Sequence, residues 1–366
     1  MSEKNTSNSY YAIGLMSGTS LDGLDISYSK FIKSADRWSF ELISSKAISY
    51  SQDLKIKLKS TVDMSALEIT KFDVELGQYF ARELETFISE EKITEIDVIG
   101  SHGHTVFHQP ENGFTLQIGN ASWIHEVINR TVVADFRSQD VVMGGQGAPL
   151  VPIGDRLLFS EYDFRINLGG FANISFEDNG KTIAYDICAV NTILNVYANK
   201  LGFEYDDKGK ISKKGKIIQE LYDQLEQIEY YKQSPPKSLG VEWNEAVLFP
   251  LLQKYDGSKV EDIMHTYTLH VAKQISDSLA GNNTKALISG GGAFNDYLIE
   301  LIKTQTDSDI IIENKGITDF KEAIIFSFLA VLKIRNEVNC LSEVTGAKED
   351  HSSGLIYSFN MKNTLS

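Results

Sequence analysis

The chain has 366 residues, 42% of them hydrophobic, which predicts a globular protein with room for two hydrophobic cores. Its formal net charge of −15 argues against nucleic acid as the main partner, because such binding needs a concentrated basic surface. Two cysteines are too few for a disulfide framework, and no apolar run is long enough to span a bilayer, so we expect a cytoplasmic protein without a membrane partner.

The first third of the chain predicts three strands, a helix, and then more strands and helices. Its predicted strands are Tyr11–Met16, Leu24–Tyr28, Ser39–Ile48, Ile96–Gly100, Thr115–Ile118 and Thr131–Asp135. A long helix is predicted over Ser65–Ser89, where apolar residues recur at three- and four-residue steps, and shorter helices are predicted near Leu54–Ser60 and Ala121–Asn129. The strand that begins at Ile96 is expected to end in a polar turn, Ser101–Thr105.

The order of elements then repeats. The predicted strands of the second part are Phe164–Leu168, Asn173–Phe176, Thr182–Ile187, Ala286–Ser289 and Asp309–Ile312. Helices are predicted over Thr192–Leu201 and Lys321–Arg335. This repetition predicts an α/β protein with two similar domains that face each other across a cleft. We expect the first domain to comprise residues 1–136 and about 348–366, and the second domain to comprise residues 137–347.

A polar loop with the sequence SGTSLDG separates the first two predicted strands. Its glycines permit positive φ and a close approach of ligand to backbone, and its hydroxyl and N–H groups suit an anion such as phosphate. The carboxylates of Asp22 and Asp25 suit a divalent metal bound to that phosphate. The alternative is an ordinary hairpin with a polar turn. The candidate nucleotide-binding residues here are Gly18, Thr19, Ser20, Leu21, Asp22, Gly23, Leu24 and Asp25.

Two further groups of polar residues follow predicted strands, where open α/β sheets bind their ligands. Ser101 and His102 are candidates for hydrogen bonding to a polar substrate; a structural turn is the alternative, and no cluster completes a zinc site with the histidines. Asp135 and Arg137 can bind hydroxyls and a carboxylate, because a guanidinium matches carboxylate geometry. An internal ion pair between these two residues is the equal alternative.

The second part of the chain offers a second phosphate turn, a carboxylate and a glycine-rich turn. Asn167, Gly169 and Gly170 occupy the position equivalent to the opening loop. Asp186 ends a predicted strand just before a helix, where a carboxylate suits a general base or metal partner; a helix N-cap is the alternative. The three glycines 290–292 let a flat ring such as adenine lie close against the backbone.

Together these turns resemble the ATP-binding fold of actin, Hsp70 and the sugar kinases, which has two ribonuclease H-like domains. The chain has no GxxxxGK[ST] motif and no protein-kinase motifs. From Tyr11 to Ala347 the resemblance is closer, to the anhydro-N-acetylmuramic acid kinase family. The blocks that carry this resemblance are GLMSGTSLDGLD, IGSHGHTVFHQP, FTLQIGN, VVADFRSQDVVMGGQGAPLVP, NLGGFANIS, SGGGAFN and SEVTGA.

The resemblance implies an ATP- and Mg²⁺-dependent enzyme of peptidoglycan recycling that forms a homodimer. Such enzymes add water across the anhydro bridge of 1,6-anhydro-N-acetylmuramic acid and phosphorylate the released O6. The resemblance makes Asp186 the catalytic residue, and Asp22 is our candidate for the metal contact. Two departures stand out: the family commonly has DTGPGN where this chain has DICAVN at 186–191, and Gln where it has His104.

Two alternatives stay open from the sequence. The first is another sugar or acyl-phosphate kinase of the same fold, since fold does not fix the substrate. The second is a nucleotide-binding member with weakened or no catalysis, against which the presence of Asp22 and Asp186 argues.

Overall fold

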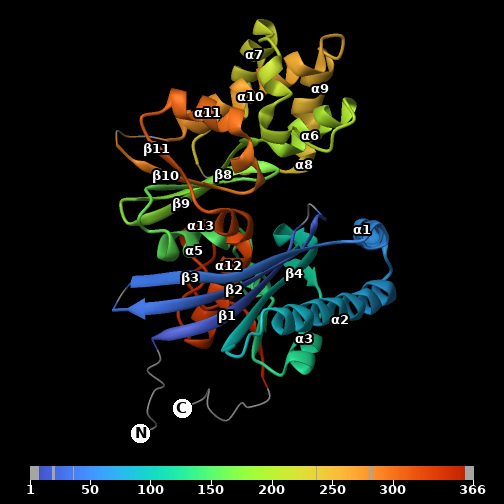
Figure 1. Cartoon of the computed structure of the whole chain (residues 1–366), viewed down its shortest axis with the longest axis vertical. Helices are drawn as coiled ribbons and strands as arrows, with labels where there is room; N and C mark the ends of the chain where they lie inside the picture. The colour runs from blue at the N-terminus through green and yellow to red at the C-terminus, as the bar shows by residue number, and fades with distance from the viewer. Residues whose placement is uncertain are drawn as a thin grey trace. The chain divides into compact units, whose positions relative to one another are not determined.

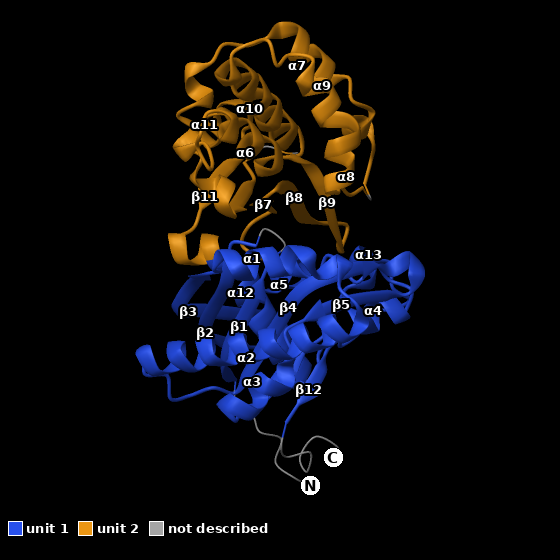
Figure 2. Cartoon of the chain, turned by 90° about the vertical axis from the view of Figure 1, so that its right-hand side faces the viewer, with its two compact units in different colours: residues 1–158, 320–366 blue, residues 159–319 orange. Residues whose placement is uncertain are grey.

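The computed structural model describes residues 8–18, 21–35, 37–235, 237–279, 281 and 283–358 (Figure 1). The chain forms two compact units, which Figure 2 shows in separate colours. Unit 1 comprises Met1–Leu158 and Phe320–Ser366, and unit 2 comprises Phe159–Asp319. The chain returns from unit 2 to unit 1 within helix α12 (Lys315–Ile334).

The sheet of unit 1 has the strand order β12-β6-β4-β1-β2-β3, with β5 paired to β4 outside this path. Strand β1 pairs antiparallel with β2 and parallel with β4, β2 pairs antiparallel with β3, and β4 pairs parallel with β6. The strands are β1 (Ser9–Ser17), β2 (Gly23–Ser34), β3 (Arg37–Ser49), β4 (Val98–Gln109), β5 (Phe114–Ile118), β6 (Val132–Ala134) and β12 (Leu355–Tyr357).

The sheet of unit 2 has the order β11-β10-β7-β8-β9. Strand β7 pairs antiparallel with β8 and parallel with β10, β8 pairs antiparallel with β9, and β10 pairs parallel with β11. The strands are β7 (Phe164–Leu168), β8 (Phe171–Asp178), β9 (Lys181–Ala189), β10 (Lys285–Ser289) and β11 (Asp309–Ile312).

The two sheets share one topology. In each, three consecutive antiparallel strands are followed by two strands that extend the sheet in parallel from the first: β4 and β6 in unit 1, β10 and β11 in unit 2. This is the strand order of a ribonuclease H-like domain, and it occurs twice. The prediction of two similar α/β domains is confirmed.

The helices of unit 1 are α1 (Gln52–Lys59), α2 (Ala66–Glu90), α3 (Ala121–Ile128), α4 (Ser138–Val142), α5 (Val151–Leu158) and α13 (Ser342–Thr345), together with most of α12. The helices of unit 2 are α6 (Asn191–Lys200), α7 (Gln219–Glu226), α8 (Val241–Trp243), α9 (Phe249–Gln253), α10 (Val260–Asp277) and α11 (Asp296–Gln305). The π-helical turn Asn244–Leu248 joins α8 to α9. No helix among the described residues is long and apolar enough to cross a membrane.

Strand β1 of unit 1 packs against helices on both faces of the sheet. Its successive side chains point to opposite faces, so neighbouring residues contact different helices. Ile13 and Leu15 belong to the core that includes Leu76 and Phe80 of α2, which runs beside this sheet in Figure 1. Gly14 faces the other way, toward α12, and a Cβ atom at this position would lie 1.8 Å from the Ala323 carbonyl oxygen. The absence of a side chain therefore lets α12 pack directly on the strand.

We expect Gly14→Ala to lower the free energy of unfolding by about 2 kcal/mol or more, because overpacking of this size costs about 1–3 kcal/mol and the obstructing atom is backbone. Thermal and urea unfolding measure the loss. Gly257→Ala is the control, since its Cβ would have no atom within 4 Å. Equal stability of the two variants would contradict the close packing of α12.

The structure corrects two expectations. Strand β4 does not end at Gly100; it continues through the predicted turn to Gln109, because β5 pairs with its second half. The unit boundaries also differ from those we expected. Residues 137–158 and 320–347, which we expected in the second domain, belong to unit 1. Arg137 bonds to His102 of β4, and Asp140 accepts hydrogen bonds from Cys340 and Thr345 within the same unit.

Candidate functional site

The turn between β1 and β2 is fixed at its base by a buried hydrogen-bond network. Tyr50 donates to the Ser17 hydroxyl (2.6 Å), and the same hydroxyl lies 3.0 Å from His104 Nδ1. Ser17 is 1% exposed. The expectation that its hydroxyl faces an anion is therefore wrong; it anchors the loop to β4. Thr19 and Ser20 lie outside the described residues.

The remaining described residues of this turn are a partly buried leucine, Leu21, and an exposed aspartate, Asp22. Leu21 has a φ of 61°, donates to the Gly18 carbonyl and packs against the core of unit 1. Asp22 is exposed, and its backbone carbonyl accepts from the Tyr50 N–H. Gly23 begins β2, and a Cβ atom at this position would lie 2.2 Å from the Ile48 carbonyl oxygen. The turn thus presents the Asp22 side chain to solvent on a firmly held backbone.

Leu24 and Asp25 lie on opposite faces of β2. Leu24 is fully buried in the core of unit 1, whereas Asp25 is half-buried and pairs across the sheet with Met16 and Ala47. The Asp25 charge is one of the causes that raise the pKa of Tyr50, after burial, the largest cause. Asp25 therefore belongs to the electrostatic surroundings of the turn's base.

Burial lowers the pKa of His104 to about 4, so its ring is neutral near pH 7. The unfolded chain takes up this proton below about pH 6.5, so His104 makes the folded state lose stability as the pH falls toward 4. His104→Gln can retain a hydrogen bond to Ser17 without titrating. We expect wild type to lose about 2 kcal/mol more than this variant between pH 7 and pH 5 in urea unfolding. Equal losses would show that His104 is not buried as a neutral ring.

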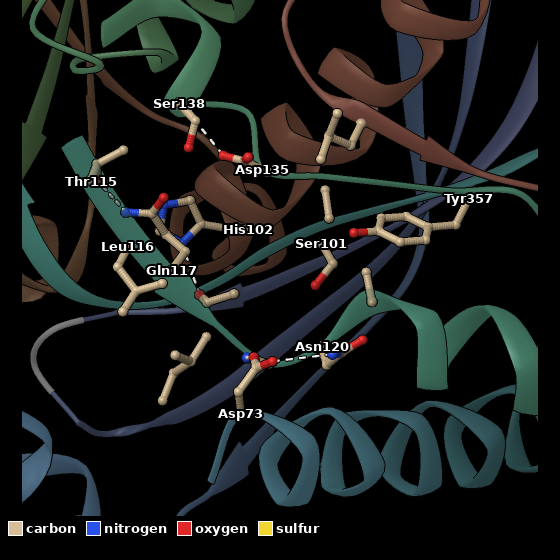
Figure 3. Close-up of a pocket in the computed structure, with 16 residues that line it drawn as sticks. Asp73, Ser101, His102, Thr115, Leu116, Gln117, Asn120, Asp135, Ser138 and Tyr357 are labelled. Atoms are coloured by element: carbon tan, nitrogen blue, oxygen red, sulfur yellow. Dashed lines mark hydrogen bonds between the residues drawn. The ribbon is translucent and has the colours of Figure 1, made fainter. Parts of the chain in front are cut away.

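A polar cavity of about 200 Å³ lies at the end of the same sheet, lined by residues from several elements. Figure 3 shows Ser101 and His102 from β4, Gln117 from β5 and Asp135 after β6 around it. Asp135 accepts from the Ser138 N–H (3.1 Å). The structure therefore brings Ser101, His102 and Asp135 together at one cavity. The buried Ser101 Oγ and Gln117 Oε1 have no hydrogen-bond partner within the described part of the chain.

Arg137 is absent from the lining residues and acts on the cavity through His102. Its Nε and Nη2 lie 3.0 and 2.8 Å from His102 Nε2, and its Nη1 donates to the Gly147 carbonyl (2.7 Å). A guanidinium only donates, so His102 Nε2 accepts, and Nδ1 carries the hydrogen that reaches the Gly103 carbonyl (2.9 Å). Burial and the Arg137 charge hold the pKa of His102 well below its usual value. The hydrogen-bond partners that the structure shows for Arg137 are thus a histidine and a carbonyl, while Asp135 bonds to the Ser138 N–H. Substrate binding by Arg137 stays a prediction.

Three polar side chains form a row across unit 2. Asn167 of β7 is paired with Asn173 of β8, and Asn173 is paired with Asp186 of β9. Cross-strand partners project from the same face of a sheet, so the three side chains share a face. A register shift next to Asn173 leaves Ile187 unpaired and sets Asp186 opposite Asn173. The pairing therefore sets Asn173 between the two predicted site residues Asn167 and Asp186.

The glycine-rich turn after β10 packs against the end of β7. Gly290 has a φ of 82°, and a Cβ there would lie 2.5 Å from Asn167 Oδ1. A Cβ on Gly292 would lie 2.7 Å from Leu168 Cβ, whereas one on Gly291 would meet nothing within 4 Å. The two predicted nucleotide turns of unit 2 are therefore neighbours. Of the three glycines 290–292, Gly291 is the one whose missing side chain would face open space.

Asp186 is half-buried and is held by the segment that precedes α8. Its Oδ2 accepts from the Leu239 N–H (2.8 Å), its N–H donates to the Lys237 carbonyl, and its carbonyl accepts from the Tyr230 hydroxyl (2.6 Å). Burial raises the pKa of Asp186, and the Leu239 hydrogen bond opposes this rise. The carboxylate is thus both fixed in place and more basic than an exposed aspartate. It does not cap α6, which has no side-chain cap.

The DICAVN departure is accommodated in the core. Cys188, Ala189 and Val190 are fully buried among the apolar side chains of unit 2. The N–H groups of Val190, Asn191 and Thr192 donate to the carbonyls of Gly169 and Gly170. These amides therefore bind the neighbouring glycine turn and are not free to bind a ligand.

Several residues of these sites were not singled out from the sequence. Tyr50, Asp73 and Leu239 reach them through contacts between distant segments: Asp73 accepts from the Gly119 N–H (2.8 Å) and the Asn120 amide (3.1 Å) beside the cavity. Asn120 and Gln117 belong to the block FTLQIGN, which carries part of the family resemblance, so the sequence offered a signal for these two residues. His102 and His104 belong to no group of three metal-ligating side chains in the described part of the chain.

Comparison with known families gives one result over nearly the whole chain. The family model described as anhydro-N-acetylmuramic acid kinase matches residues 10–359. The curated anhydro-N-acetylmuramic acid kinase of Sulfurimonas denitrificans is 32% identical over 95% of this chain and 100% of its own length. The enzymes of that name from Francisella tularensis subsp. novicida and Bacillus cereus are 33% and 31% identical, over 92% and 93% of this chain and 96% and 97% of their own lengths.

Solved structures give more distant matches. Component A of (R)-2-hydroxyglutaryl-CoA dehydratase from Acidaminococcus fermentans aligns with a TM-score of 0.45 at 13% identity, covering 88% of this chain and 98% of that one. A ROK family glucokinase from Streptomyces griseus, in complex with glucose and AMPPNP, aligns with a TM-score of 0.39 at 10% identity, covering 88% and 99%. Alignments this distant add nothing to the fold that the strand order defines.

Proposed function

The chain belongs to the anhydro-N-acetylmuramic acid kinase family, and from this premise we propose that it opens the 1,6-anhydro ring of 1,6-anhydro-N-acetylmuramic acid by hydrolysis and phosphorylates O6. The products are N-acetylmuramic acid 6-phosphate and ADP. The proposal includes a cytoplasmic role in peptidoglycan recycling and a homodimeric enzyme. The family membership makes the protein a kinase; the reaction is our proposal.

One observation carries the proposal: Asp186 is a fixed, half-buried carboxylate that shares a sheet face with Asn167 and Asn173. Ring opening requires a base to take a proton from the water that attacks the anomeric carbon. Burial raises the pKa of Asp186, which makes its carboxylate a stronger proton acceptor. As the anomeric carbon gains the water oxygen, its bond to O6 breaks, and O6 accepts the γ-phosphoryl group of ATP.

Three turns are proposed to bind ATP. Gly18–Asp25 and Asn167–Gly170 would contact the phosphates with backbone N–H groups, and the turn at 290–292 would contact the adenine. The exposed face of Gly291 and the glycine contacts with β7 support the last assignment, because a bulkier turn would not fit against that strand.

The proposed cofactor Mg²⁺ prefers oxygen ligands and keeps several of its own waters. The exposed carboxylate of Asp22 suits this chemistry, since it offers hard oxygen donors beside a phosphate turn. Bound Mg²⁺ would neutralise charge on the transferring phosphoryl group. In this chain Asp22 would orient that ion, directly or through a water.

The cavity of unit 1 is the proposed contact site for the sugar. Ser101 and Asp135 offer hydrogen-bonding groups at its wall, where the His102 ring also lies, and Ser101 Oγ has no partner in the described part of the chain. Arg137 holds the His102 ring in one orientation and remains charged near neutral pH, since burial lowers its pKa only to about 10. A fixed, polar cavity suits a ligand rich in hydroxyl and amide groups.

Coupled measurement of ADP release with a panel of sugars tests the proposal. We expect 1,6-anhydro-N-acetylmuramic acid to be turned over far faster than glucose, N-acetylglucosamine or acetate, each supplied with MgATP. Preference for a sugar with a free alcohol would favour another kinase of the same fold. Nucleotide binding without ADP release on any acceptor would favour a member with weakened catalysis.

A further inference from the structure

Asp140, Cys340 and His351 form a buried group in unit 1 that the proposed reaction does not use. Their side chains are 0%, 1% and 8% exposed. The Asp140 carboxylate, the Cys340 sulfur and a His351 ring nitrogen all lie within 4.8 Å of one another. Cys340 and His351 are brought together by an isolated antiparallel bridge, and Asp140 comes from α4.

The His351 ring is oriented as a metal ligand would be. Its Nδ1 lies 3.0 Å from the Glu349 carbonyl oxygen, which can only accept, so Nδ1 carries a hydrogen. Its Nε2 is buried, has no hydrogen-bond partner in the described part of the chain, and lies 3.6 Å from Asp140 Oδ1. In neutral His351 two acceptor atoms therefore face each other, an arrangement that a cation between them would stabilise. Donation of the other ring N–H to a carbonyl is the usual support of a metal-bound histidine.

The donor set is sulfur, nitrogen and oxygen, which suits Zn²⁺ more than a hard cation. Cys340 Sγ donates to Asp140 Oδ1 at 3.0 Å. Tetrahedral Zn²⁺ places a sulfur and an oxygen ligand about 3.5 Å apart and a nitrogen and an oxygen ligand about 3.3 Å apart. Binding would therefore lengthen the Cys340–Asp140 separation of 3.0 Å by about half an ångström and shorten the His351–Asp140 separation of 3.6 Å by a few tenths. We propose that Asp140 Oδ1, Cys340 Sγ and His351 Nε2 bind one Zn²⁺, with water as the fourth ligand. Binding replaces the thiol hydrogen of Cys340, and that proton passes to solvent.

Neighbouring groups hold the Asp140 carboxylate in place by hydrogen bonds. The Gly147 N–H donates to Oδ2 (2.7 Å) and the Thr345 hydroxyl donates to Oδ1 (2.7 Å). The Gly147 carbonyl in turn accepts from Arg137, which holds His102 at the cavity of unit 1. The Zn²⁺ thus joins α4, the glycine-rich segment after it and the C-terminal bridge, and it stabilises the segment that positions Arg137.

Titration of the chelator-treated, full-length protein with Co²⁺ alone tests this site. We expect one equivalent to bind, with visible bands of tetrahedral cobalt and an ultraviolet thiolate-to-cobalt band. Cys340→Ser should remove the thiolate band, and His351→Gln should weaken binding at least about ten-fold. Cys188→Ser is the matched control, because Cys188 is equally buried but lies in unit 2. Zn²⁺ should raise the thermal unfolding midpoint of wild type, since it binds only the folded site.

Three results would overturn the proposal: no thiolate band in wild type, an unchanged band in Cys340→Ser, or an unfolding midpoint that Zn²⁺ does not raise. His351→Gln leaves Cys340 and Asp140 in place, so it gives a second test of the site if Cys340→Ser fails to fold. A fourth result would also overturn it: no Co²⁺ binding, together with a pH-dependent stability that His351→Gln abolishes. That result would show that a proton on His351 Nε2, and not a metal ion, lies between His351 and Asp140.

Discussion

Asp186→Asn should reduce product formation about 10²–10⁴-fold, the usual cost of removing a general base. The amide oxygen can still accept from the Leu239 N–H, and the backbone bonds to Lys237 and Tyr230 do not involve the side chain. We therefore expect an intact fold and MgATP affinity within a few-fold of wild type. Steady-state kinetics with the anhydro sugar, together with nucleotide binding by calorimetry, measures both quantities.

Asp309→Asn is the matched control, since Asp309 is an exposed aspartate on β11 of the same sheet. It should leave the rate unchanged. If Asp186→Asn retained more than about a tenth of the wild-type rate, another carboxylate would have to act as the base. The buried DICAVN segment would then mark a branch of the family that carries out its chemistry elsewhere.

Asp22→Ala should lower kcat/KM for MgATP by about 10²-fold, comparable to the loss of one group that stabilises transition-state charge. The Asp22 side chain is exposed, and the contact that fixes its turn runs from the Tyr50 N–H to the Asp22 backbone carbonyl. The free energy of unfolding should therefore change by no more than about 0.5 kcal/mol. Kinetics at varied MgATP concentration and urea unfolding test the two halves of this prediction.

Asp63→Ala, which removes an exposed carboxylate from another turn of unit 1, should leave both quantities unchanged. Wild-type kinetics in Asp22→Ala would exclude this turn from MgATP binding. A folding defect in Asp22→Ala would instead show that the side chain stabilises the hairpin, as in the alternative of an ordinary polar turn.

Local sequence predicted most of the fold because apolar runs and glycines mark the ends of strands. Phe164–Leu168 was predicted with the bounds of β7, since Gly169 follows it directly. The end of β4 was not predictable, because its second half is polar and is a strand only through pairing with β5. Composition and periodicity describe a segment, whereas pairing depends on a partner elsewhere in the chain.

The candidate sites divide in the same way. Asp186 was predicted from its place at a strand end, but the Leu239 N–H that fixes its carboxylate lies in another segment and offers no side-chain signal. Ser17 was misread because its polar hydroxyl suits a ligand turn as well as it suits Tyr50 and His104. The group of Asp140, Cys340 and His351 joins three segments that no local pattern connects.

Mass spectrometry of the product made in ¹⁸O-enriched water tests the proposed reaction most directly. If water adds to the anomeric carbon as O6 is phosphorylated, the sugar phosphate formed from 1,6-anhydro-N-acetylmuramic acid carries one ¹⁸O atom at C1 and none in its phosphate. The phosphate is unlabelled because all its oxygens come from ATP and O6. A phosphorylated product that still contains the anhydro bridge, or one whose ¹⁸O lies in the phosphate, would contradict the account.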